Sequence, residues 1–169
     1  MFLGFATLGN NFLVTILSRV GDVPTNGTNP PTVRVYGSSG LMTNGTGSSS
    51  FKDTASITGA TNANPIVITS AAHGLSNGSR VTITGVVGNT AANTTATVAN
   101  VATNTFELAS VAGNGAYVSG GTWNVTGLYT YTVPATAANG YASGSTYHLL
   151  VTTTISSTVY SWVHSFCVV

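Results

Sequence analysis

Short runs of Val, Ile, Thr, Tyr and Phe recur along this chain, and clusters of Gly, Asn or Ser separate them. Within many of these runs apolar and polar residues alternate, which is the period of a strand with one buried face. The sequence shows no long amphipathic helical pattern. It therefore predicts an all-β protein of many short strands, and 169 residues suffice for one large domain or two small ones.

The C-terminal segment allows a pairing register to be predicted. One face of a hairpin would carry Tyr147, Leu149, Val151, Ile155, Tyr160, Trp162, His164 and Phe166. A turn centred on Ser156 and Ser157 would bring the two arms together. The predicted cross-strand pairs are Tyr147 with Phe166, Leu149 with His164, and Val151 with Trp162. We expect these side chains to share one core.

Further strands are predicted at residues 12–20, 32–36, 51–57 and 128–133, and five more at 65–70, 80–85, 94–101, 104–109 and 116–123. The apolar N-terminus has no basic region and is interrupted by Asn10 and Asn11, so a strand is expected there rather than a signal peptide. Residues 37–50 are rich in Gly, Ser and Asn, which predicts a long flexible connection.

Two similar phrases, Ser56–Gly59 and Asn124–Gly127, bracket the middle of the chain. Removing the segment between them would join two strand patterns directly, as expected for a domain inserted in a loop. We therefore predict one domain made of residues 1–59 and 125–169, with residues 60–124 as the insert. About sixty residues can form a small β-barrel, although such a domain is marginal by itself.

Charged residues are scarce, with only four Lys or Arg and three Asp or Glu, or 4% of the chain, against ~25% in ordinary soluble proteins. The four basic residues are widely spaced, so no nucleic acid is expected as a partner. No run of 18 apolar residues predicts a membrane span. Weak self-repulsion favours packing against copies or partners, which indicates a structural or adhesive module rather than an enzyme.

Few residues are candidates for catalysis or for metal binding. The carboxylates Asp22, Asp53 and Glu107 are far apart in the sequence, and structural or solvated roles are expected for each. Cys167 is expected to be a buried, inert thiol. No catalytic residue and no cofactor are therefore predicted.

The three histidines are not expected to form a zinc site. In the predicted hairpin His148 points away from the face that holds His164, and His73 belongs to the insert. Aromatic residues leave one weaker hypothesis, in which Trp123, Tyr129 and Tyr131 contact a glycan if they are exposed. Packing is the commoner role of aromatic strand residues.

The insert carries a family resemblance. Its segment Asn64–Ile83, which contains Ala72-His73-Gly74-Leu75, is followed by Asn104–Leu108 and by Gly120–Trp123. These phrases resemble a small β-barrel module of tailed-bacteriophage structural proteins, often described as similar to the first catalytic cysteine half-domain of ubiquitin-activating enzymes. The resemblance implies that fold, but it brings no catalytic residue, because the insert has no cysteine.

The flanking segments have a looser resemblance. Met1–Gly9, Pro30–Tyr36, Gly127–Tyr129 and Gly140–Tyr147 are similar to segments of small immunoglobulin-like virion proteins. Together the two resemblances imply a discontinuous immunoglobulin-like β-sandwich with an inserted barrel.

The resemblances also imply a location and partners. The expected function is that of a capsid decoration or cement protein, bound to the major capsid protein or other virion proteins on the phage head. We expect a homo-oligomer, with a trimer as one form. The alternatives are a tail, neck or fibre-associated protein and a glycan-binding adhesin.

Overall fold

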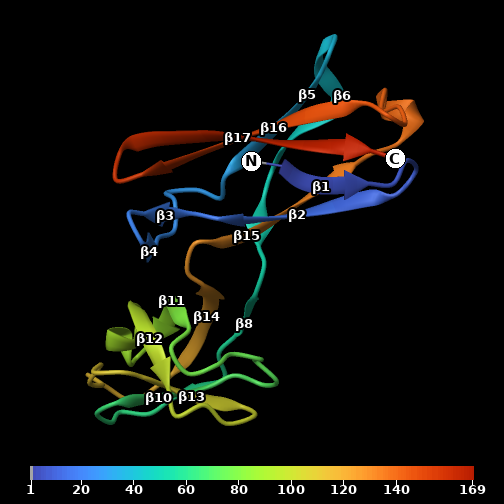
Figure 1. Cartoon of the computed structure of the whole chain (residues 1–169). Helices are drawn as coiled ribbons and strands as arrows, with labels where there is room; N and C mark the ends of the chain where they lie inside the picture. Colours follow the sequence, from blue (N-terminus) through green and yellow to red (C-terminus); the bar gives the residue numbers. More distant parts are fainter. Residues whose placement is uncertain (1) are drawn as a thin grey trace. The chain divides into compact units, whose positions relative to one another are not determined.

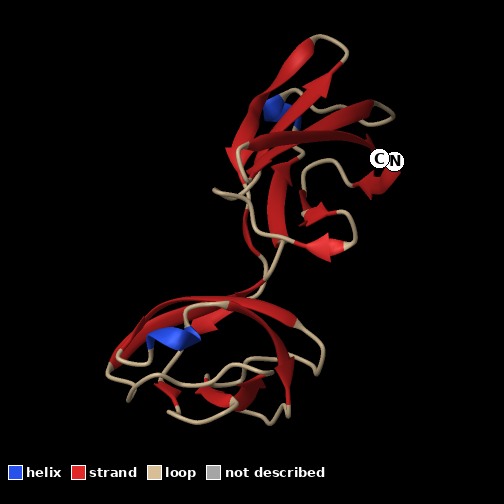
Figure 2. Cartoon of the chain, turned by 90° about the vertical axis from the view of Figure 1, so that its left-hand side faces the viewer, coloured by secondary structure: helices blue, strands red, loops and turns tan. Residues whose placement is uncertain are grey.

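The computed structural model describes residues 2–169 and shows an all-β protein in which those residues form no α-helix. The chain divides into two compact units, each considered by itself below. The discontinuous unit comprises Met1–Phe51 and Gly127–Val169, and the continuous unit comprises Lys52–Thr126. Strands dominate both units, and the helical pieces of the described chain are two three-residue 3₁₀ turns at Thr90–Ala92 and Ala137–Asn139 (Figure 2).

Two main sheets form the discontinuous unit (Figure 1). The first has the order β1-β17-β16-β5-β6, formed by β1 (Phe2–Ala6), β17 (Thr158–Val168), β16 (Thr146–Ile155), β5 (Thr32–Gly37) and β6 (Gly40–Ser48). The second has the order β2-β15-β7, formed by β2 (Asn11–Leu17), β15 (Leu128–Pro134) and β7 (Ser50–Phe51). All these pairs are antiparallel except β1 with β17. A separate ribbon pairs β3 (Arg19–Val20) with β4 (Val23–Pro24).

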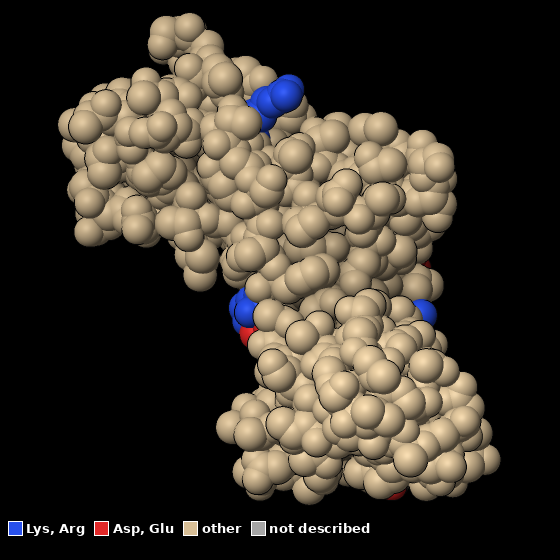
Figure 3. Space-filling view, turned by 180° about the vertical axis from the view of Figure 1, so that it is seen from behind, with Lys and Arg blue, Asp and Glu red and all other residues tan. Residues whose placement is uncertain are grey.

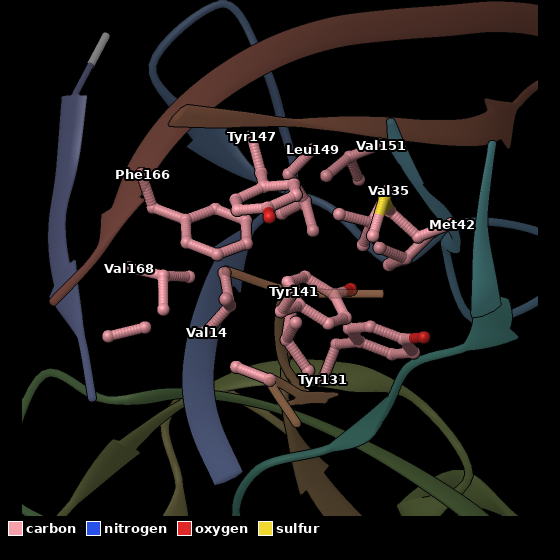
Figure 4. Packing of buried hydrophobic residues seen from close by; sticks show 14 of the residues in the cluster. Val14, Val35, Met42, Tyr131, Tyr141, Tyr147, Leu149, Val151, Phe166 and Val168 are labelled. Carbon is pink, nitrogen blue, oxygen red and sulfur yellow. The ribbon is translucent and has the colours of Figure 1, made fainter. Parts of the chain in front are cut away.

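One hydrophobic core lies between these two sheets. β2 contributes Val14, and β16 and β17 contribute Leu149 and Phe166 from the opposite sheet. Figure 4 shows the rings of Tyr147 and Phe166 side by side, and their centroids are 5.6 Å apart. Because alternate residues of each strand point inward, the apolar faces of both sheets are buried together.

The register predicted for the C-terminal hairpin is confirmed. β16 and β17 pair Tyr147 with Phe166, Leu149 with His164, and Val151 with Trp162. Tyr147, Leu149, Val151 and Phe166 are all buried, and Trp162 packs against the same core. The alternation of apolar residues was sufficient to define this pairing, because a slip by one residue would turn every side chain to the other face.

The turn of this hairpin offers a stabilising change. Ser156 and Ser157 have φ angles of 48° and 67°, a conformation that costs a non-glycine residue about 1–2 kcal/mol. Asn-Gly is the preferred pair in two-residue turns of this kind. We expect the double substitution Ser156→Asn, Ser157→Gly to raise the free energy of unfolding by roughly 1 kcal/mol in urea titrations.

A matched control for this change lies between β5 and β6. Ser38 and Ser39 also form a two-residue turn between paired strands, but neither has a positive φ angle. Ser38→Asn, Ser39→Gly should therefore give no gain. An equal gain at both turns would contradict the conformational explanation.

The long flexible connection predicted at residues 37–50 is wrong. This segment contains β6, which pairs with β5, and it buries Met42 in the core. Its glycines permit close packing rather than mobility: a Cβ on Gly47 would lie 2.8 Å from the ring of Tyr131. The composition suggested flexibility. Glycine is instead needed at position 47 because any side chain there would collide with the ring of Tyr131.

The strand predicted at residues 12–20 is interrupted. β2 ends at Leu17, and the buried Ser18 bonds through its N–H to the carbonyl of Gly127. Val20 has the same parity as the buried Val14 and Ile16, but it is 43% exposed because it belongs to the separate β3-β4 ribbon.

The continuous unit contains one sheet of seven strands in the order β8-β14-β11-β12-β13-β10-β9. Its strands are β8 (Thr54–Ser56), β9 (Gly59–Ala60), β10 (Ile66–Thr69), β11 (Arg80–Val87), β12 (Thr95–Ala99), β13 (Thr105–Leu108) and β14 (Ser119–Val125). All five strands predicted in the insert are present, with shifted ends. The sheet encloses its own core, which includes Ile68, Ile83, Phe106 and Trp123.

The expected closed barrel is not found in the described chain, since β8 and β9 end the sheet without pairing to each other. These two strands are consecutive pieces of one segment, separated by Ile57 and Thr58. The unit also begins at Lys52 rather than at residue 60, and it ends at Thr126 rather than at 124. β8 belongs to it because Ala55 pairs with Trp123 and Ile57 lies in its core.

Within residues 2–169, no helix is long and apolar enough to cross a membrane.

Candidate functional site

The proposed glycan-contact residue Trp123 lies inside the continuous unit. Its ring is only 2% exposed and meets the ring of Phe106 edge-on, with centroids 6.2 Å apart. The indole Nε1–H donates a hydrogen bond of 2.8 Å to Ser70 Oγ, and the Ser70 hydroxyl donates in turn to the Ser56 carbonyl. A ring held in this way has no open face on which a sugar could stack.

Tyr129 and Tyr131 are also buried, in the core of the discontinuous unit. Tyr129 is 0% exposed and stacks on Phe51, with centroids 5.0 Å apart, while its hydroxyl accepts a bond from the N–H of Gly27. Burial raises the pKa of Tyr129 and that of Tyr131 above 10.0. The glycan hypothesis requires these rings and that of Trp123 to be exposed. Because all three are buried, the hypothesis is wrong.

A signal for this burial was present in the sequence. Tyr129 and Tyr131 have the same parity as Val133 in one strand, and all three point into the core. Their alternation with Thr130 and Thr132 is the pattern of a half-buried strand.

The hydrogen bond of Trp123 predicts a measurable coupling. Ser70→Ala would leave the indole N–H without its acceptor in a buried place, which should cost roughly 1–2 kcal/mol of unfolding free energy. The double variant Ser70→Ala, Trp123→Phe should lose less than the sum of the single losses, as measured by circular dichroism in urea. Strict additivity would show that the bond contributes nothing.

His148 and His164 lie on opposite faces of the C-terminal hairpin, as the strand pattern predicts. His148 is exposed and its Nδ1 lies 2.9 Å from Ser165 Oγ, whereas His164 lies beside Leu149 on the other face of the hairpin. His73 belongs to the continuous unit. Among residues 2–169, no three His, Cys, Asp or Glu side chains are placed so that they could hold a metal ion.

His73 borders a hollow of about 530 Å³ on the continuous unit, next to Leu75 and Val101. Its Nδ1 accepts a bond of 3.1 Å from the N–H of Leu75, so Nε2 carries the proton and donates to the carbonyl of Ala102 at 2.8 Å. Its ring also meets Phe106 edge-on. Both ring nitrogens serve the fold, so His73 offers this hollow neither a base nor a metal ligand.

The carboxylates have local partners or an exposed position. Asp53 pairs with Lys52 at 3.3 Å, Glu107 accepts a bond of 2.7 Å from the amide of Asn100, and Asp22 is exposed in the turn between β3 and β4. Asp22 lies in the discontinuous unit and the other two in the continuous unit. The free thiol of Cys167 is half-buried rather than buried as expected, because β17 turns it away from the core.

The Lys52–Asp53 pair predicts a small effect. Both side chains are more than 40% exposed, and exposed ion pairs contribute little. Asp53→Asn should change the unfolding free energy by less than about 0.5 kcal/mol in urea titrations at low and at high salt. A larger loss of unfolding free energy that depends on salt would show that this ion pair stabilises the fold.

The surface of the described chain carries few charged side chains. In the face shown in Figure 3 nearly all visible atoms belong to residues other than Lys, Arg, Asp and Glu. Large apolar side chains stand exposed on both units: Phe5, Leu13, Leu17, Val20, Val23, Leu41, Val87, Val118, Val159, Val163 and Val169. These exposed residues were not predicted from the sequence, although the alternation that turns Trp162 towards the core places Val159 and Val163 outward.

Fold and surface together define an all-β protein of two units with few charged and several exposed apolar side chains. No protein-family model matches this sequence, and neither does any curated protein. The resemblance to phage modules therefore stays a hypothesis.

Proposed function

We propose that this chain is a structural protein of a tailed-bacteriophage particle, and specifically a decoration protein that binds the head shell and stabilises it. The observation that carries the proposal is the uncharged, partly apolar surface of a two-unit β protein. In this proposal the discontinuous unit is an immunoglobulin-like sandwich that seats on the shell. The continuous unit is a barrel-like module that projects or contacts a neighbouring copy.

The physical support for the proposal is the cost of burying charge. An unpaired ion that is taken out of water costs several kcal/mol, so a surface of Thr, Ser, Asn and Val can be covered by a partner far more easily. Only Arg19, Asp22 and Arg34 carry formal charge in the discontinuous unit. Many copies on a symmetric shell would then add modest contacts into a large gain in particle stability.

The test is to purify particles of the phage that encodes the chain and to locate it by electron cryomicroscopy and quantitative mass spectrometry. The proposal expects density on the head with the copy number of a shell component, and heads that lack the protein should break at lower temperature. A low copy number at the tail or neck would favour the alternative location. Absence from the particle would overturn the proposal altogether.

A further inference from the structure

The first half of β17 is a strand edge that no other described strand covers. β17 pairs with β16 along residues 158–167, but β1 pairs with its other side only from Ser165 to Val168. Because N–H and C=O groups alternate in direction along a strand, residues 158–163 present some of them on the side away from β16. Figure 1 shows this part of the hairpin (red) extending beyond the start of β1.

This edge lacks the features that normally prevent strands from pairing between molecules. Natural edge strands carry Lys, Pro or a bulge, but β16 and β17 contain no Lys, Arg, Asp, Glu or Pro. Their pairing runs from Thr146 to Ile155 without a register shift. β6, at the opposite end of the sheet, does have a shift against β5 and a left-handed residue, Asn44, with φ 54°.

The sequence of the β17 edge is complementary to itself. An antiparallel copy related by a two-fold axis at Ser161 would place Val159 opposite Val163 and Tyr160 opposite Trp162, each pair occurring twice. Val159 and Val163 are 64% and 53% exposed and share one face of the strand, while the two aromatic residues share the other. Pairs of β-branched residues and pairs of aromatic residues are the favourable cross-strand combinations.

We propose that this edge binds a second copy of the chain, with residues 158–163 of the two β17 strands pairing antiparallel about a two-fold axis at Ser161. The two five-stranded sheets then form one continuous sheet. A second copy is the occupant because the strand is complementary to itself at this register: the apolar pair and the aromatic pair each form twice, which is the condition for a two-fold interface. The expected assembly is a dimer rather than a trimer, and the inference does not depend on the proposed function.

The first test compares two lysine variants of the full chain by analytical ultracentrifugation over a range of concentrations. Ser161→Lys puts two like charges at the axis, and Thr152→Lys is its matched control. The two residues are opposite one another on the same face, and either change removes the Thr152–Ser161 side-chain contact. Thr152, however, lies between β17 and β5 and not at the edge.

The unmodified chain should form a dimer with twice the 17.1 kDa chain mass. Ser161→Lys should weaken dimerisation about tenfold or more, since like charges directly opposite each other repel, and Thr152→Lys should not. Equal thermal stability of the two variants would show that folding is intact. A chain that stays monomeric, a trimer, or equal weakening by both variants would overturn the proposal.

The second test addresses the register directly. In a Cys167→Ser background, Ser161→Cys should form a cross-linked dimer under mild oxidation or with a short thiol-reactive linker, because residue 161 faces its own copy at the axis. Thr152→Cys in the same background should not cross-link. A dimer that persists in solution without cross-linking through residue 161 would place the interface elsewhere and overturn the proposal.

Discussion

Phe166→Ala is expected to lower the unfolding free energy of the discontinuous unit by about 3–5 kcal/mol, a large fraction of the roughly 5–15 kcal/mol that a domain possesses. Phe166 is 0% exposed. The centroid of its ring lies 5.3 Å from that of Phe12 and 5.6 Å from that of Tyr147. Its removal leaves a cavity where both sheets meet. The continuous unit has a separate core, so its stability should be nearly unchanged.

Each unit contains one tryptophan, so the two responses can be measured separately. Trp162 belongs to the discontinuous unit and Trp123 to the continuous unit. Urea titrations followed by fluorescence in Trp123→Phe and Trp162→Phe backgrounds would therefore follow one unit at a time. Leu13→Ala, an exposed change on β2 of the same unit, is the control and should stay within about 0.5 kcal/mol. Equal losses in both units would show that they unfold as one.

The reciprocal change, Phe106→Ala, is expected to weaken the continuous unit. Phe106 is fully buried in that unit and contacts His73 and Trp123. Its removal should lower the unfolding free energy of the continuous unit by about 3–5 kcal/mol, measured in the Trp162→Phe background. Because the two units have separate cores, the discontinuous unit should be nearly unchanged. A loss of similar size in the discontinuous unit would contradict this expectation.

The sequence predicted the strands and the hairpin register because alternation is a local property. Tyr147 and Phe166 could be paired from parity alone. The strand β6 was not predicted, because the fit of Gly47 against Tyr131 depends on residues far apart in the chain. Likewise, β8 was assigned to the wrong unit, since its pairing with β14 is a long-range contact that no local pattern reports.

The candidate site was harder to predict for a related reason. Trp123, Tyr129 and Tyr131 were proposed from residue type, but residue type does not indicate exposure. The alternation along this strand, in contrast, predicts that Tyr129 lies on the same buried face as Val133. The uncovered edge of β17 could not be read from the sequence, because it depends on where β1 stops pairing, at Ser165.

Alkaline pH is expected to destabilise the discontinuous unit through Tyr141. Its side chain is 2% exposed, and its hydroxyl has no hydrogen-bond partner in the described protein. Burial raises the pKa of Tyr141 to about 12, and the neighbouring Tyr131 and Tyr147 contribute to that rise (Figure 4). The ordinary pKa of 10.0 applies in the unfolded chain, so between these two values the folded state holds a proton that the unfolded state releases.

The sign of the effect follows from this difference in bound protons. Stability is retained below pH 10 and falls by about 1.4 kcal/mol for each pH unit as the pH rises towards 12. Urea titrations at several pH values in the Trp123→Phe background would measure this slope for the discontinuous unit.

Tyr141→Phe separates this explanation from general alkaline denaturation. The variant removes the ionisable group and a buried hydroxyl that has no partner, so at neutral pH it should be as stable as the unmodified chain or more stable. It should also lose most of the stability slope between pH 10 and 12, because Tyr129 and Tyr131, whose pKa values burial also raises, account for the remainder. An unchanged slope in Tyr141→Phe would show that the alkaline transition arises elsewhere.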